Sequence, residues 1–391
     1  MLSTILNIAL YVSSTYFGLV ILYQFALAVG SKFERGQVSN WTSNKSRFLV
    51  LVPAYKEDVV VINSATKNVN VDYPSQLFEY VVIADQLKEE TIYSLKSKGI
   101  NVLRVAFEQS TKVKSLQAAL LKYGYHNYDG VVILDADNVM SNNFLNEANR
   151  QMQSGKLVIQ SERVASNLNT TAAVFDAISE KANNEIVCKG ANYFSLSSKL
   201  SGSGMIFKSQ LFGELIKECK AIGGFDKELE LKLTQRRIFI HYSDLLNVKD
   251  EKIGSYNDMS KQRSRWLQAQ YNYFKNSINE IVPALVKGHF DHVHKILQLA
   301  LPPRALIAVG LLPPVIIYSL NGDLVSVLVL LSLMAMNALT YFILIPRQWL
   351  LEHGSNLIME LPRLIIAACK ALVLMPKAKK KFIHTVHTNK I

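Results

Sequence analysis

Two aspartates that lie two positions apart, Asp135 and Asp137, are the residues of this chain best suited to chemistry. They follow residues 130–134 (Gly-Val-Val-Ile-Leu), a run that predicts a buried strand. Carboxylates at the carboxyl end of such a strand lie at the sheet edge where α/β proteins bind ligands. Because hard oxygen ligands select Mg²⁺ or Mn²⁺, the pair suits a divalent ion held against a diphosphate. The alternative is an ordinary turn, since Asn138 follows directly and Asp is common in turns.

Apolar runs alternate with helical stretches on both sides of this pair. The expected strands are residues 48–52, 80–84, 102–106, 131–135 and 157–160, and the expected helices are residues 58–68, 89–98, 113–122 and 142–153. Such alternation predicts a mainly parallel sheet with helices on both faces.

The composition indicates a chain with both soluble and membrane-associated parts. Its 391 residues suffice for two or three structural units, and 49% are hydrophobic although 19% are charged. The net charge of +12 fits membrane flanks and a phosphate-rich substrate. We expect no nucleic-acid partner, because no basic and aromatic recognition motif accompanies this charge. Cys188, Cys219 and Cys369 lack metal-ligand spacing, which favours reduced thiols and a reducing compartment.

Residues 1–31 carry no charge and predict an N-terminal transmembrane helix. The segment is longer than the apolar region of a signal peptide and has no basic residues before it. Lys32, Arg35, Lys45 and Arg47 follow, so the positive-inside rule places the N-terminus outside and the next domain in the cytoplasm.

A second apolar region, residues 296–346, predicts two further spans at residues 305–320 and 324–345. The adjacent Pro313 and Pro314 predict a kink in the first of them.

Residues 350–391 predict an amphipathic helix in the membrane interface followed by a basic cytoplasmic tail. Glu360, Arg363 and Lys370 fall within an arc of about 80° on a helix, which favours an interfacial helix over a further span. The lysines of residues 377–381 then place the C-terminus inside. The alternative topology has four spans and leaves these lysines outside.

Five short motifs, in this order, resemble those of a membrane-embedded family 2 glycosyltransferase of the cellulose, chitin, hyaluronan and chitooligosaccharide synthase branch. They are residues 52–57 (Val-Pro-Ala-Tyr-Lys-Glu), 83–85 (Ile-Ala-Asp), 135–137 (Asp-Ala-Asp), 201–205 (Ser-Gly-Ser-Gly-Met) and 262–266 (Gln-Arg-Ser-Arg-Trp). The resemblance covers nearly all of the chain. It implies an α/β GT-A-type nucleotide-sugar-binding domain over residues 46–280, with N- and C-terminal transmembrane helices.

The resemblance also implies a role for each motif. The nucleotide side would comprise Pro53, Ala54, Tyr55, Glu57, Asp85, Lys114, Asp135, Gln262, Arg263 and Arg265. The acceptor side would comprise Gly202, Ser203, Gly204 and Trp266, and the metal ligands would be Asp135 and Asp137. Plainer interpretations remain open. Asp85 could be a helix cap or turn residue, Glu57 could be a first-turn helix residue, and Lys114 could be a solvated helix residue. The glycines could form a simple turn, and the arginines and the tryptophan could form an interfacial belt near the membrane.

One segment departs from the family pattern, and this departure leaves the general base open. The family has Thr-Glu-Asp followed by Leu-x-Leu, with the Asp as base, whereas residues 226–231 read Asp-Lys-Glu-Leu-Glu-Leu. Aligning Leu229 and Leu231 with that pattern puts Glu228 at the base position, and Asp226 is the alternative.

The activity implied is inverting transfer of a hexose from a UDP-sugar, UDP-glucose or UDP-N-acetylglucosamine, to a growing β-linked saccharide. It would use Mn²⁺ or Mg²⁺ at the cytoplasmic face of the cytoplasmic membrane. A lipid acceptor is the alternative within enzymes, and a catalytically impaired scaffold subunit is the alternative outside them. Three spans in one protomer favour either short products or a channel shared with another subunit, as a homo-oligomer or with an export partner.

Overall fold

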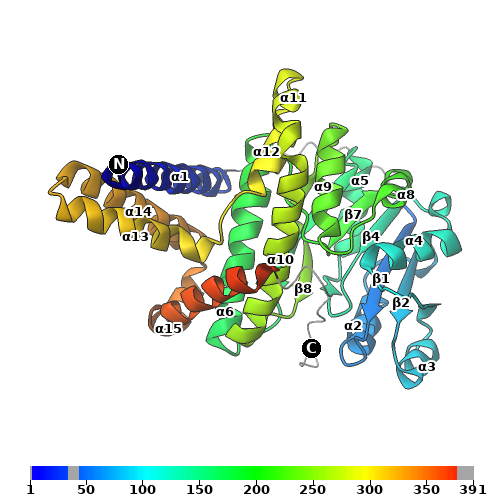
Figure 1. Cartoon of the computed structure of the whole chain (residues 1–391). Helices are drawn as coiled ribbons and strands as arrows, with labels where there is room; N and C mark the ends of the chain where they lie inside the picture. Colours follow the sequence, from blue (N-terminus) through cyan, green and yellow to red (C-terminus); the bar gives the residue numbers. More distant parts are fainter. Residues whose placement is uncertain (1, 34–43, 377–391) are drawn as a thin grey trace.

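The computed structural model describes residues 2–33 and 44–376 (Figure 1). The predictions made on Arg35 and on the lysines of residues 377–381 lie outside the described residues.

An eight-stranded mixed sheet forms the centre of the α/β domain, with the strand order β3-β2-β1-β4-β7-β6-β8-β5. The strands are β1 (Phe48–Tyr55), β2 (Phe78–Asp85), β3 (Asn101–Val105), β4 (Gly130–Ile133), β5 (Val139–Met140), β6 (Val158–Ala165), β7 (Met205–Lys208) and β8 (His241–Asp250). All five expected strands are confirmed, and β5, β7 and β8 were not expected.

The sheet is mixed: four of its seven strand pairs are parallel and three are antiparallel, so the expectation of a mainly parallel sheet holds only in part. Strands β3, β2, β1 and β4 are parallel, and β6 is parallel to β8. Strand β7 is antiparallel to both β4 and β6, and β5 is antiparallel to β8. The register shows why β7 is antiparallel to β4: Met205 at the start of β7 is the partner of Ile133 at the end of β4. The chain therefore enters β7 from the edge at which β4 ends.

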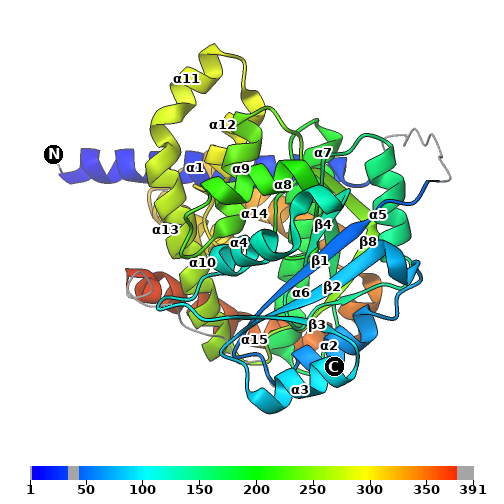
Figure 2. The same ribbon diagram turned by 90° about the vertical axis from the view of Figure 1, so that its right-hand side faces the viewer.

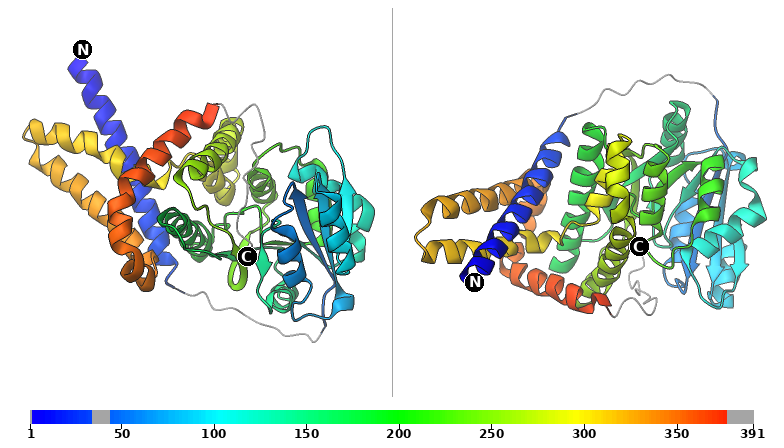
Figure 3. Two further views of the ribbon diagram at one scale, coloured as in Figure 1. Left: turned by 90° about the horizontal axis from the view of Figure 1, so that it is seen from below. Right: turned by 45° about the horizontal axis from the view of Figure 1, so that its top comes forward.

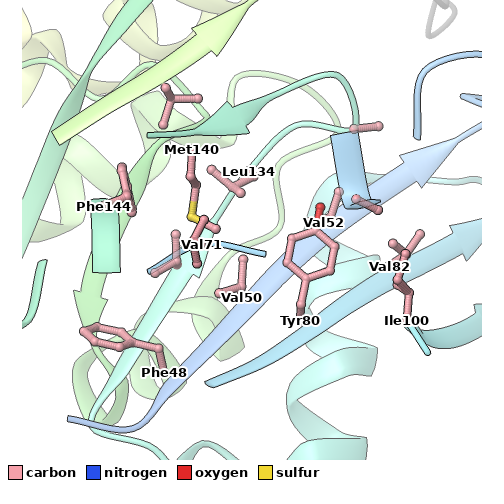
Figure 4. Close-up of a cluster of buried hydrophobic side chains, with 14 of the residues drawn as sticks. Phe48, Val50, Val52, Val71, Tyr80, Val82, Ile100, Leu134, Met140 and Phe144 are labelled. Atoms are coloured by element: carbon pink, nitrogen blue, oxygen red, sulfur yellow. The ribbon is translucent and has the colours of Figure 1, made fainter. Parts of the chain in front are cut away.

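The two faces of β1 bury two separate hydrophobic clusters. Phe48, Val50 and Val52 face one side, where helices α2, α3 and α5 pack (Figure 4). Leu49 and Leu51 face the other side, where α4, α8 and α9 pack. Strand side chains alternate between faces, so a continuous apolar run is what a strand covered on both sides requires.

Helices cover both faces of this sheet, as expected (Figure 2). Their bounds are α2 (Val61–Asn68), α3 (Glu89–Ser97), α4 (Lys112–Tyr123), α5 (Phe144–Gln153), α6 (Thr171–Ala182), α7 (Ala191–Tyr193), α8 (Ser209–Glu218), α9 (Phe225–Gln235), α10 (Tyr256–Ser277), α11 (Ile281–Val286) and α12 (Phe290–Gln298). A π-helical stretch, η3 (Asn183–Gly190), continues α6, and short 3₁₀ turns are η1 (Ser75–Leu77), η2 (Tyr125–Asn127), η4 (Ile278–Glu280) and η5 (Arg304–Leu306).

Three apolar helices pack together on one side of the α/β domain: α1 (Leu2–Gly30), α13 (Ile307–Leu320) and α14 (Leu324–Leu344) (Figures 1 and 3). Two segments among the described residues, Thr4–Gly30 and Leu324–Leu344, have the length and composition to cross a membrane. The stretch Arg304–Leu320 is apolar but shorter. Helix α13 contains Pro313 and Pro314.

Helix α15 (Arg347–Leu374) turns its polar side toward α10. The Tyr256 hydroxyl donates to Glu360 over 2.7 Å, and the Lys370 ammonium donates to Asn257 over 2.8 Å. The opposite side leaves large apolar side chains exposed, namely Leu351, Ile358, Met359, Ile366 and Val373. The side that packs on the α/β domain also buries Leu357 and Leu364 in a cluster with Met259, so apolar and polar contacts together hold α15 in place.

A close backbone approach joins α1 to the π-helical stretch η3. A Cβ added at Gly190 would lie 2.1 Å from the Leu27 carbonyl oxygen, so only glycine fits there. A nearby ion pair, Lys32 with Glu185 at 3.4 Å, spans the same interface.

We expect Gly190→Ala to destabilise the protein by about 1–3 kcal/mol or more, because the new methyl group meets backbone that cannot rotate away. The measurement is thermal unfolding in a neutral detergent. Gly354→Ala in α15 is the matched control: a Cβ there meets nothing within 4 Å, so alanine should be neutral or stabilising by up to about 1 kcal/mol. Equal effects of the two substitutions would contradict the packing described.

A buried ion network joins β6, β8 and α6. Arg163 contacts Asp250 and lies 3.7 Å from Glu180, and Lys252 lies 2.7 Å from Asp250 and 3.8 Å from Glu180. Burial opposes the charge on Arg163, but Asp250 and Glu180 raise the pKa of its guanidinium above its ordinary value. Two cations and two carboxylates thus balance inside the domain.

We expect Arg163→Met to cost about 3–5 kcal/mol of stability, because removing one partner leaves a buried carboxylate uncompensated. Arg104→Met is the matched control, since the Arg104–Glu89 pair is exposed and should contribute about 1 kcal/mol or less. Chemical unfolding of the two variants beside the wild type gives both values. A loss at Arg163 no larger than that at Arg104 would show that the network does not hold β6, β8 and α6 together.

Candidate active site

The carboxyl ends of β1 and β2 form the first side of the site. Tyr55 and Asp85 are partners in the parallel register, preceded by the pairs Pro53 with Ile83 and Ala54 with Ala84. The next residues, Lys56 and Gln86, have positive φ angles of 58° and 57°. Both strands therefore end in a sharp turn at the same edge, and non-glycine residues in this conformation often accompany functional sites.

Asp85 has the chemistry of a ligand-binding carboxylate. Its side chain is buried, and among the described residues its Oδ1 atom has no hydrogen-bond partner. Burial raises the pKa of Asp85, while Ser110 and Lys56 act in the opposite direction. A buried acceptor without a donor is costly, so it is explained when a ligand supplies the N–H or O–H.

Asp135 and Asp137 lie just past the end of β4, at the same edge. Asp137 is buried, and its carboxylate accepts from the Asn138 amide over 3.1 Å and from the Glu251 backbone N–H over 3.3 Å. Asp135 is more exposed and contacts the Lys112 ammonium. One carboxylate is thus held rigidly by the protein, and the other faces the opening.

Lys112, and not Lys114, is the lysine that reaches the aspartates. Besides contacting Asp135, its ammonium donates to the Gly202 carbonyl over 2.7 Å. The Lys114 ammonium instead donates to the Gln109 carbonyl over 2.8 Å. The two lysines have different partners because residues two apart on a helix lie about 200° apart and so face different sides of α4.

The small-residue loop is fastened to the metal motif. The Ser203 side chain is buried; its hydroxyl accepts from the Asp135 backbone N–H over 2.9 Å and donates to Asn138. Gly202 and Gly204 have φ angles of +83° and +62°, and a Cβ at Gly204 would lie 2.1 Å from the Ser161 hydroxyl. Ser203 thus positions the aspartates and is not exposed to an acceptor, which departs from its expected role.

The two candidate bases lie on different sides of α9. Glu228 accepts from the backbone N–H groups of Lys220 at 3.1 Å and Ala221 at 2.9 Å, so its carboxylate holds a loop. Asp226 lies 2.9 Å from the Lys227 ammonium. Burial acts to raise the pKa of Asp226, but Lys227 and Lys199 outweigh burial and lower it.

The residue before Asp226 connects α9 to the aspartates. The Lys112 ammonium lies 5.2 Å from the centre of the Phe225 ring, and a Cβ at Gly202 would lie 3.8 Å from the same ring. The first turn of α9, which carries both Asp226 and Glu228, therefore lies near the site. Their contacts distinguish them: the Glu228 carboxylate already accepts from two backbone N–H groups of a loop, which favours Asp226 as the base.

The motif of residues 262–266 lies on α10. Arg263 pairs with Asp176 of α6 at 3.5 Å, so its guanidinium joins two helices. Burial lowers the pKa of Arg265, and the side-chain amide oxygen of Gln262 (Oε1) is buried with no hydrogen-bond partner among the described residues. Trp266 is 46% exposed, which leaves its ring available to a sugar or to the membrane. Glu57, the remaining nucleotide-side residue, accepts through its backbone carbonyl from Val61 at 3.2 Å.

The donor set fits a divalent ion that a substrate helps to coordinate. Among residues 2–33 and 44–376, no group of three or more His, Cys, Asp and Glu side chains could enclose a metal. Mg²⁺ and Mn²⁺ at phosphate-transfer sites commonly take one or two carboxylates and complete their shell with phosphate and water. Asp135 and Asp137 match that requirement.

Sequence reasoning missed Lys112, Arg163 and Asp250. Lys112 had a signal, because it begins α4 directly after the cap residue Thr111. Arg163 and Asp250 had none, since they meet only because β6 pairs with β8 in parallel.

Comparison with known proteins gives a consistent result. Residues 46–269 match the family model described as glycosyltransferase like family 2. A curated relative, the probable glycosyltransferase YdaM of Bacillus subtilis (strain 168), is 25% identical over 144 residues, which cover 34% of each chain. The chain thus matches about a third of the length of that relative.

Two solved structures align with this chain to different extents. The mannosyltransferase PcManGT from Pyrobaculum calidifontis, in complex with GDP-Man and Mn²⁺, aligns with a TM-score of 0.59 at 16% identity, over 95% of this chain and 98% of that one. Glucosyl-3-phosphoglycerate synthase from Mycobacterium tuberculosis aligns with a TM-score of 0.42 at 15% identity, over 61% and 84%. The α/β domain thus has a GT-A-like nucleotide-sugar-binding fold, and because the family model covers more than half of the 391 residues, the chain belongs to the family 2 glycosyltransferases.

Proposed function

We propose that this protein is an inverting glycosyltransferase that moves a hexose from a UDP-sugar to a hydroxyl of a growing β-linked saccharide at the membrane. The observation that carries the proposal is the shared sheet edge. It combines a buried carboxylate oxygen without a donor, on Asp85, with the Asp135–Asp137 pair. A base with an N–H donor and a diphosphate with a divalent ion would satisfy both at once.

On the donor side, Asp85 accepts from the uracil N3–H, with Tyr55 and the turn at Lys56 beside it. We propose UDP rather than another nucleotide because these motifs resemble those of the synthase branch of family 2 glycosyltransferases. The Pyrobaculum calidifontis relative was solved with GDP-Man, so the identity of the base is part of the proposal.

The diphosphate lies against Asp135, Asp137 and Lys112. Mn²⁺ or Mg²⁺, when bound to the two aspartates, supplies positive charge to the leaving diphosphate. Lys112 adds a positive charge from α4. With this charge in place, the leaving oxygen needs no proton from the protein.

On the acceptor side, Asp226 takes the proton of the attacking hydroxyl. The acceptor oxygen forms its bond to C1 as the bond from C1 to the diphosphate oxygen breaks, and the nucleoside diphosphate leaves. One displacement inverts C1, so an α-linked donor gives a β-glycoside. The lowered pKa of Asp226 keeps the carboxylate ionised at neutral pH, which a base requires.

The apolar helices α1 and α14 favour a membrane location, and we propose that they cross the cytoplasmic membrane with the α/β domain inside. Helix α15, with its exposed apolar side, would lie in the membrane interface. The same arrangement favours a lipid acceptor as the second candidate, because a lipid hydroxyl could reach the site from the bilayer. A catalytically impaired scaffold is disfavoured, since the aspartate pair and an ionised base candidate are all present.

The base assignment reverses the preference for Glu228 and is tested by a matched pair. We expect Asp226→Asn to lower the rate of UDP release from UDP-glucose or UDP-N-acetylglucosamine by about 10²–10⁴-fold, as loss of a general base does. Glu228→Gln should keep most of the activity, because the amide oxygen can still accept from the Lys220 and Ala221 backbone. Both variants should bind UDP as the wild type does, measured by calorimetry.

If Glu228→Gln is inactive and Asp226→Asn is active, the general base is Glu228. A wild-type protein that neither binds UDP nor releases it from any UDP-sugar would refute the donor assignment itself.

A further inference from the structure

Helix α12 connects the apolar helix α1 to the two elements that form the acceptor side of the proposed site. One of these elements is α9, whose second residue is Asp226. The other is the segment of residues 197–204, which ends in the small-residue loop. Helix α12 lies beside α9 (Figure 1). Its side chains form a continuous chain of contacts from α9 to α1.

The inner end of this chain is the carboxylate of Glu230, which is 5% exposed and lies one helical turn after Asp226 on α9. It accepts from the Leu200 backbone N–H over 2.6 Å. Leu200 directly precedes the small-residue loop, which contacts the Lys112 ammonium and the Asp135 backbone N–H. Glu230 therefore fixes this loop relative to the helix that carries the proposed base.

The next members of the chain lie on α12 and reach α1. The ammonium of Lys295, whose side chain is fully buried, lies 3.9 Å from the Glu230 carboxylate and donates to the side-chain oxygen of Gln298 over 3.0 Å. The amide nitrogen of Gln298 donates to the Tyr23 hydroxyl of α1 over 3.0 Å. That hydroxyl also lies 2.9 Å from Nε2 of His294. One ion pair and two hydrogen bonds thus connect Glu230 to Tyr23.

Two further attachments hold α12 to the acceptor side. The Asp291 carboxylate accepts from the Ser197 backbone N–H over 2.7 Å and from the Ser197 hydroxyl over 2.5 Å. Nδ1 of His292 lies 3.0 Å from the Thr234 hydroxyl near the end of α9. A shift of α12 would therefore move both α9 and the segment before the small-residue loop. The donor side rests on other elements, namely β1, β2 and α4.

We propose that Tyr23, Lys295 and Glu230 are positioning residues that couple the packing of α1 to the geometry of the acceptor side. Tyr23 holds α12 in place, and Glu230 keeps the small-residue loop and Asp226 aligned for attack on the donor. All three act through other residues, so they are not catalytic residues themselves. The inference rests on the proposed function, in which Asp226 serves the acceptor. It adds that α1, besides favouring a membrane location, sets the rate of transfer.

The first test removes the hydroxyl at the α1 end of the chain in the full-length protein in neutral detergent. Tyr23→Phe should lower kcat for UDP release from a UDP-sugar about three- to tenfold, the size that loss of one orienting hydrogen bond allows. The KM for the UDP-sugar and the affinity for UDP in calorimetry should not change, because the donor side rests on other elements.

Tyr16→Phe is the matched control for this variant. The Tyr16 hydroxyl also joins α1 to the chain beyond α12, since it donates to the Ala300 carbonyl over 2.8 Å, but it lies outside the contacts that lead to Glu230. Its loss should leave kcat at the wild-type value. An unchanged kcat in a Tyr23→Phe protein that unfolds at the wild-type temperature overturns the proposal, and so does an equal loss in Tyr16→Phe.

A double-mutant cycle tests whether the two ends of the chain act together. Glu230→Gln keeps an oxygen that accepts from the Leu200 N–H but removes the charge that faces Lys295, and should also lower kcat about three- to tenfold. The double variant with Tyr23→Phe should be no slower than the slower single variant, because either change breaks the same chain. Independent residues multiply their effects, so a loss equal to the product of the two single losses would refute the coupling.

Hydrogen exchange tests the coupling separately from the proposed function. Without any substrate, the peptide that contains Leu200 should exchange its amide about three- to tenfold faster in Tyr23→Phe than in the wild type, and at the wild-type rate in Tyr16→Phe. Unchanged exchange in Tyr23→Phe overturns the inference whatever the activity of the protein. If exchange changes as expected but the wild type turns over no UDP-sugar, the proposed function is wrong and the link between α1 and the loop stands.

Discussion

The contact between Lys112 and Asp135 is the interaction on which the rest of the site depends. Lys112 begins α4, Asp135 follows β4, and the same ammonium holds the Gly202 carbonyl of a loop far along the chain. Ser203 adds a second bond between that loop and Asp135. Three segments with little in common in sequence are thus tied at one sheet edge by a charge-assisted contact and a hydrogen bond.

The charges behind this edge fall into two groups. Arg163, Lys252, Asp250 and Glu180 balance one another and hold β6, β8 and α6 in place beneath the aspartates. The second group lies along α9, where Lys227 is 2.9 Å from Asp226 and Lys295 is 3.9 Å from Glu230. In both groups, removing one partner would leave a buried charge uncompensated.

The parts of the fold that the sequence predicts well are those with a strong local signal. The runs that became β1, β2 and β4 are continuously apolar, and Asp85 and Asp135 mark their ends directly. The antiparallel insertion of β7 between β4 and β6, which makes the sheet mixed, depends on contacts between distant segments and has no comparable local signal. The contacts of Lys114 and Glu228 could not be read from the sequence: Lys114 donates to the Gln109 carbonyl, and Glu228 accepts from the Lys220 and Ala221 backbone. Residues two apart on a helix turn to different sides, and a motif written as a line of letters does not show which side faces which neighbour. The pairing of Arg163 with Asp250 depends on tertiary structure alone.

The central claim is that the Asp135–Asp137 edge binds a nucleoside diphosphate through a divalent ion, and calorimetry with UDP tests it most directly. The account predicts that wild-type protein binds UDP in Mn²⁺ at least about tenfold more tightly than in EDTA, and that Asp137→Asn removes this difference. Equal affinity of the wild type for UDP in Mn²⁺ and in EDTA would contradict it.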